Sequence, residues 1–154
     1  MKKIRMVKPI IMLLTIMILG LIMYIFTLNM RLDYKQRILN DTCLSILHDV
    51  QFAYNYDSLD ESEIRALQAV DINNLLNAQS LIYHTSWPAK DKINEMVVSL
   101  TSYYNNLYVE GKYIEASKAS SIYDNYMGVL INIDNEYSEV EIDNILEFLK
   151  YETK

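Results

Sequence analysis

The feature that most constrains this chain is a stretch of twenty residues, 9–28, without a charged side chain. At about 1.5 Å per residue, such a helix is roughly 30 Å long and matches the hydrocarbon core of a bilayer. Its Ile, Leu and Phe residues favour insertion by roughly 5 kcal/mol, at about 0.3–0.6 kcal/mol each. We therefore predict that residues 9–28 form a transmembrane signal anchor.

Two alternatives to an anchor are a buried helix of a soluble protein and a cleaved signal peptide. A helix of a soluble protein normally carries a polar stripe, and residues 9–28 have none. A signal peptide has a shorter apolar region and ends in a small-x-small cleavage site. The sequence that leaves the apolar run, YIFTLNMRLD, contains no such site. Both observations favour an uncleaved anchor.

The charges that flank the anchor predict its orientation. Four basic residues and no acidic residue precede it, whereas three basic residues follow it closely: Lys2, Lys3, Arg5 and Lys8 before, and Arg31, Lys35 and Arg37 after. Cytoplasmic flanks carry the excess of basic residues. We expect a short basic cytoplasmic tail at 1–8 and an extracytoplasmic part at 29–154, so that the protein is a single-pass protein of the cell membrane.

The part beyond the anchor is strongly acidic. It holds all twenty Asp and Glu but only ten of the fourteen Lys and Arg. Affinity for nucleic acid depends on neutralising phosphates, so this balance argues against a nucleic-acid partner. Cys43, the only cysteine, lies in an apolar helical stripe. We interpret it as a small buried hydrophobe, with an intermolecular disulfide or lipidation as the alternative.

Helical periodicity dominates residues 29–154. Apolar residues recur every three or four positions in five segments, near 32–56, 60–85, 88–110, 114–130 and 139–151. Only three Gly and two Pro occur in the whole chain, too few for the turns of a β domain. We predict an all-α fold, in which the anchor is followed by an acidic antiparallel bundle of four to five helices. A three-helix core with loosely attached ends is the alternative.

Capping signals support several of the predicted boundaries. Asp60 with Glu63, and Ser138 with Glu141, have the spacing of a capping box at a helix start. Gly111 is placed to end a helix in the left-handed conformation. We also expect the chain near Pro88 to separate two helices.

Signatures of catalysis or metal binding do not stand out in this sequence. His48 and His84 are the only histidines, and neither belongs to a paired metal motif such as H-x-x-x-H or C-x-x-C. No phosphate-binding glycine loop or G-x-S-x-G elbow is present. We therefore expect no catalytic residue, no metal, no cofactor and no enzymatic activity.

Tyrosines are the candidate contact residues. The chain has thirteen of them, and we predict that six in its second half are protein contacts: Tyr103, Tyr104, Tyr108, Tyr113, Tyr123 and Tyr126. Tyrosine is favoured at interfaces because it is large, fairly rigid and amphipathic. Core packing in a domain that is poor in Phe is the competing interpretation.

The predicted function is therefore one of binding. We expect a membrane-anchored bacterial envelope protein whose outer bundle binds another envelope or membrane protein, as an assembly, regulatory or adaptor subunit. The alternative is a ligand-sensing bundle that signals through a partner membrane protein. Such a bundle resembles, in architecture alone, the sensing domains of bacterial chemoreceptors and histidine kinases.

Overall fold

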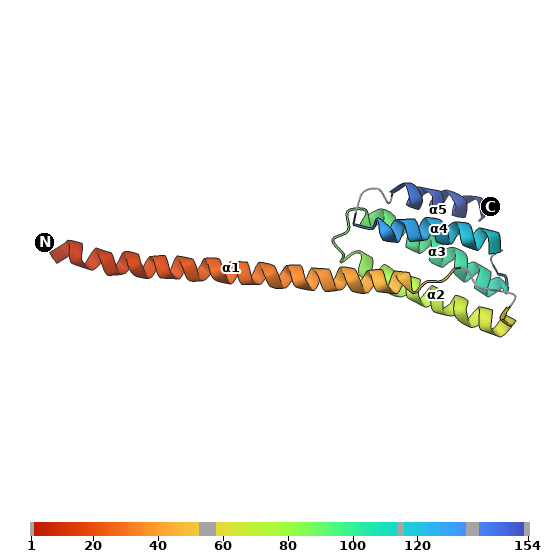
Figure 1. The fold of residues 1–154 in the computed structure, drawn as a ribbon, viewed down its shortest axis with the longest axis horizontal. Coiled ribbons are helices and arrows are strands. Elements are labelled where there is room, and N and C mark those ends of the chain that lie inside the picture. The colour runs from red at the N-terminus through yellow and green to blue at the C-terminus, as the bar shows by residue number, and fades with distance from the viewer. Residues whose placement is uncertain (1, 53–57, 114–115, 135–138, 153–154) are drawn as a thin grey trace. The chain divides into compact units, whose positions relative to one another are not determined.

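The computed structural model of the chain describes residues 2–52, 58–113, 116–134 and 139–152. These residues form no β-strand and five α-helices: α1 Lys2–His48, α2 Glu61–Ile82, α3 Lys90–Glu110, α4 Ala116–Ile131 and α5 Glu139–Glu152 (Figure 1). The prediction of an all-α fold is confirmed. The chain divides into two compact units, Met1–Ile38 and Leu39–Lys154, and α1 contributes residues to both.

The first unit contains the apolar part of α1. Within the described residues, the segment Ile11–His48 is long and apolar enough to cross a membrane, and its mean hydropathy reaches 2.6. None of the stretch with this hydropathy is buried against other parts of the protein, whereas the core helix of a soluble protein is mostly buried. Thr15 and Thr27 donate their hydroxyls to the carbonyls four residues earlier, each at 2.9 Å. Both hydroxyls are therefore satisfied within the helix, as an apolar surrounding requires.

The helix α1 runs on past the apolar segment, as predicted, but it ends at His48 and not near residue 56. Val50 and Phe52 follow outside the helix, and both are buried. The backbone N–H of Gln51 donates to the Asp71 carboxylate at 3.0 Å. The Gln51 N–H, which lies outside the helix, thus has a hydrogen-bond partner on α2. The prediction is therefore wrong for residues 49–52, and residues 53–56 lie outside the described residues.

The second unit is a helical bundle. Within it, α2 packs against α3, α3 against α5, and α4 against α5. Successive helices from α2 to α5 run in alternating directions (Figure 1). A Cβ on Gly128 of α4 would lie 3.0 Å from Cγ of Glu141 on α5, so a larger residue at this position would press against α5. The predicted antiparallel bundle is present in this unit.

Aromatic rings fill the centre of the bundle. Phe52 contacts Tyr104 and Tyr126 with ring centroids 4.9 Å apart in both pairs. The Phe52–Tyr126 pair is edge-to-face at 87°, an arrangement that adds to the stabilisation from burial alone. A segment that follows α1 is thus fixed against side chains of α3 and α4.

The helix ends follow local rules where the described residues allow a comparison. Asp60 Oδ1 accepts from the Glu63 N–H, and Glu63 Oε2 accepts from the Asp60 N–H, both at 2.9 Å, so the predicted capping box is confirmed. Gly111 ends α3 with φ of 66°, also as predicted. Pro88 lies in the turn between α2 and α3, and α3 begins two residues after it. The second capping box involves Ser138, which lies outside the described residues.

Candidate functional site

The six candidate tyrosines divide into two groups. Tyr103, Tyr104 and Tyr126 are buried in the core of the bundle, whereas Tyr108, Tyr113 and Tyr123 are half-buried. The first group belongs to α3 and α4, whose apolar faces point inward. Core packing therefore accounts for the first group, and the contact-surface prediction remains open for the second.

Tyr126 links α4 to the end of α1. Its hydroxyl donates to the Leu47 carbonyl oxygen at 2.8 Å across 79 positions of sequence. Burial raises the pKa of this phenol well above its ordinary value, with the nearby Asp71 carboxylate adding to the effect. Tyr126 therefore stays protonated and acts as a hydrogen-bond donor inside the core.

The half-buried tyrosines near the start of α2 have partners in the bundle. The Arg65 guanidinium lies 5.4 Å from the Tyr108 ring centroid, and its Nη2 donates to the Tyr108 carbonyl at 3.2 Å. Partial burial and a hydrogen bond with Glu61 raise the pKa of the Tyr113 phenol. These contacts tie the end of α3 and the segment after it to α2.

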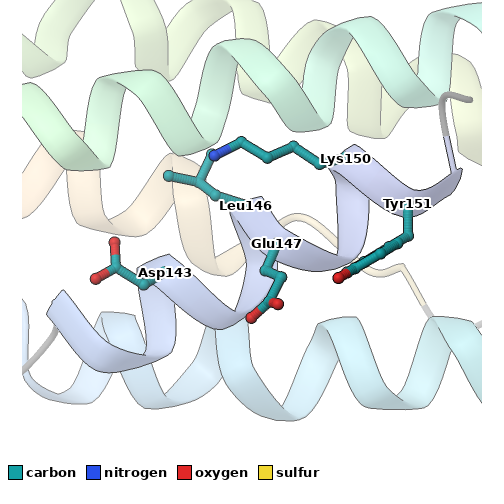
Figure 2. A pocket seen from close by; sticks show the side chains of 5 residues that line it. All are labelled: Asp143, Leu146, Glu147, Lys150 and Tyr151. Atoms are coloured by element: carbon teal, nitrogen blue, oxygen red, sulfur yellow. The ribbon is translucent and has the colours of Figure 1, made fainter.

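Two adjoining hollows lie along α5. The first has a volume of about 460 Å³, and Figure 2 shows its lining side chains, which all come from α5: Asp143, Leu146, Glu147, Lys150 and Tyr151. The second has a volume of about 250 Å³ and lies between α3 and α5; its lining residues are Glu95, Val98, Ser99, Ser102, Tyr103, Asn106, Leu146, Leu149 and Lys150. Leu146 and Lys150 line both hollows, so we treat the two together as the α3–α5 groove.

The α3–α5 groove has an apolar floor and a polar rim. Val98, Leu146 and Leu149 form the floor together with Tyr103, whose ring meets Phe148 edge-to-face at 6.4 Å between centroids. Serine, asparagine and charged side chains surround this floor. Tyr103 is the one candidate tyrosine among the lining residues of the two hollows. The packing of α5 against α3 brings these residues together, and the sequence pattern does not reveal that pairing.

Cys43 is enclosed by the bundle. Its side chain is fully buried, and its thiol contacts the Ala78 carbonyl oxygen at 3.8 Å. Burial raises the pKa of this thiol to about 11. Because the thiolate is the reactive form, a thiol with such a pKa is not a nucleophile at neutral pH. These properties agree with the interpretation of Cys43 as a small buried hydrophobe.

The other polar groups inside the bundle hold segments of the chain together. Gln68 of α2 donates to the Lys112 carbonyl at 3.4 Å, and Asn94 of α3 donates to the Tyr83 hydroxyl at 2.7 Å. His48 and His84 are both exposed. Across the described part of the chain, no group of three or more His, Cys, Asp or Glu residues is arranged to hold a metal ion.

Comparisons with protein families, with curated proteins and with solved structures find no match to this chain. The features of the molecule that bear on function are therefore the anchor candidate, the α3–α5 groove and the surface of the bundle.

Proposed function

We propose that this chain is a single-pass envelope membrane protein whose helical bundle binds another protein, as an assembly, regulatory or adaptor subunit. In this proposal residues 9–28 span the membrane, the N-terminus lies in the cytoplasm and the bundle lies outside. The exposed apolar side chains of α1 support the span. The excess of basic residues before it, four against three on the far flank, supports the orientation.

The α3–α5 groove is the observation that carries the binding proposal. An apolar centre inside a polar rim is the usual anatomy of a protein–protein contact. Both hollows are open to solvent, and the first is formed by the outer side of a single helix. Small-molecule sites instead enclose most of their ligand. The groove thus suits a protein segment, such as an amphipathic helix, that lays apolar side chains over Leu146.

The rim favours a partner segment with basic residues. Glu95, Asp143 and Glu147 line the groove, and Lys150 is the only cationic residue that the two hollows contain. Opposite charges across an interface steer association and help to fix the register of the partners. A helix with an apolar stripe flanked by Lys or Arg fits this arrangement.

A pair of valine substitutions on one helix tests the groove. Val98 and Val109 are both exposed on α3, but only Val98 lines the groove. Val98→Arg places a long cation over the floor, where it blocks the groove and repels a basic partner. Val109→Arg makes the same chemical change outside the groove and is the matched control.

The assay uses tagged full-length protein, crosslinked in its native membranes, purified and analysed by quantitative mass spectrometry. We expect a specific membrane or envelope protein with the wild type and with Val109→Arg. Val98→Arg should recover about tenfold less of it, as expected for a loss of about 1.4 kcal/mol. Equal recovery of the partner with Val98→Arg and Val109→Arg would show that the partner does not bind at the groove. Recovery of no specific partner with the wild type would count against the proposed function itself.

A further inference from the structure

The outer side of α2 bears no charged side chain beyond Arg65. Between Arg65 and Lys90 the sequence contains one formally charged residue, Asp71, and Asp71 is only 2% exposed. The exposed side of this stretch therefore bears no Asp, Glu, Lys or Arg. We call its helical part, residues 66–83, the uncharged α2 face, and the exposed residues of this face are Ala66, Val70, Asn73, Leu76, Asn77, Ser80 and Tyr83. His84, Ser86 and Pro88, which follow the face, are also exposed.

Other helices of the same unit expose charged side chains. Examples are Glu95 on α3 and Asp143 and Glu147 on α5. Residues 39–154 include nineteen Asp and Glu against seven Lys and Arg. Residues 96–109 of α3 also lack charge, but this stretch is shorter than the one between Arg65 and Lys90.

The uncharged α2 face also exposes large apolar side chains. Val70 is 51% exposed, Leu76 48% and Tyr83 56%. Depletion of charge together with exposed aliphatic and aromatic side chains is the composition of the centre of a protein interface. The face therefore differs in composition from the acidic-rimmed α3–α5 groove.

The charge balance favours a second copy of this chain as the occupant of this face. A basic partner gains more from the acidic surfaces elsewhere on the unit than from a face without charge. Two copies of this acidic unit repel each other least where their uncharged faces meet. Asn73 and Asn77 lie near the middle of the face, and a side-chain amide is both a donor and an acceptor. Identical amides can therefore pair across a two-fold axis, whereas identical charges cannot.

We propose that the uncharged α2 face joins two copies of this chain side by side in the membrane. The face spans residues 66–83, which is roughly 27 Å of helix, and a stripe about 10 Å wide along it covers roughly 270 Å². This is less than half of the roughly 800 Å² per partner in a standard stable interface. The contact is consequently weak in water and depends on the anchor, which confines both copies to one plane and raises their effective concentration. The inference rests on the anchor in the proposed function and not on the α3–α5 groove.

Single cysteines introduced on the face test this contact in the full-length protein. The native Cys43 is fully buried and does not react, so an introduced thiol reports alone. Asn73→Cys and Asn77→Cys place the thiol at the middle of the face. The middle of the face meets the same region of the second copy whether the two α2 helices run parallel or antiparallel. Asn105→Cys on α3 is the matched control, because it is also an exposed helical asparagine.

Native membranes that contain each variant are oxidised with copper–phenanthroline and analysed on a non-reducing gel. We expect a covalent homodimer from Asn73→Cys, Asn77→Cys or both, at several times the yield of Asn105→Cys. Equal yields from all three positions would indicate random collision and overturn the inference. Absence of the homodimer, or an adduct whose mass shows a different protein, would also overturn it.

A charged side chain introduced on the uncharged α2 face gives a second test of the contact. Leu76→Glu, added to Asn73→Cys, brings like charges together across the contact and should reduce the homodimer about tenfold. Val109→Glu in the same background should leave it unchanged. Homodimer formation without any recovered partner would overturn only the binding of a second protein. A recovered partner without the homodimer would overturn only this inference.

Discussion

The hydrogen bond from Tyr126 to the end of α1 allows a quantitative prediction. Tyr126→Phe keeps the aromatic ring, and with it the edge-to-face contact with Phe52, but removes the donor that lies 2.8 Å from the Leu47 oxygen. That oxygen also accepts from the Val50 N–H at 3.2 Å, so the substitution does not leave it without a partner. The expected cost is therefore that of one ordinary buried hydrogen bond, about 1 kcal/mol.

For a domain of this size, a loss of about 1 kcal/mol lowers Tm by roughly 3–6 °C. Thermal unfolding followed by circular dichroism on detergent-solubilised full-length protein measures the change. Tyr151→Phe is the control, because Tyr151 is exposed, and its Tm should match the wild type. An unchanged Tm for Tyr126→Phe would show that the bond does not stabilise the fold. A loss above about 3 kcal/mol would show that the hydroxyl supports more than this one bond.

Two further predictions concern Cys43 and the end of α3. Burial raises the pKa of Cys43 from 9.0 to about 11, so its contribution to stability is complete below pH 9 and is lost as the pH rises toward 11. In urea unfolding at pH 8 to 11, Cys43→Ala should lose less stability with rising pH than the wild type does. An unchanged pH dependence would contradict the raised pKa of Cys43. Gly111→Ala, at φ of 66°, should lose about 1 kcal/mol in the same assay at neutral pH. Gly20→Ala, with no atom within 4 Å of the added Cβ, is its control and should lose nothing.

Local signals in the sequence predicted the helices well. The capping box at Asp60 and the left-handed cap at Gly111 depend on residues within a few positions of each other, and both are present. The predicted helix from 32 to 56 failed at its end because the partner of Gln51 is Asp71, twenty positions away. A local pattern cannot show a contact of that range.

The sequence predicted the candidate site less well than it predicted the helices. Tyrosine composition indicated both core and contact roles, and only the helix packing places Tyr104 and Tyr126 inside the bundle. The α3–α5 groove depends on which helices are neighbours, and helical periodicity carries no such information. The scarcity of charge between Arg65 and Lys90 is visible in the sequence. Whether this stretch exposes any charge depends on the burial of Asp71, and only the structure shows that Asp71 is buried.

The most direct test of the central claim is the membrane topology of the full-length protein with a C-terminal tag. We predict that it stays with the membranes after alkaline carbonate extraction, and that protease added to intact spheroplasts removes the tag. Release of the protein into the soluble fraction would contradict the anchor. A tag that remains protected until the membrane is permeabilised would contradict the outward orientation of the bundle.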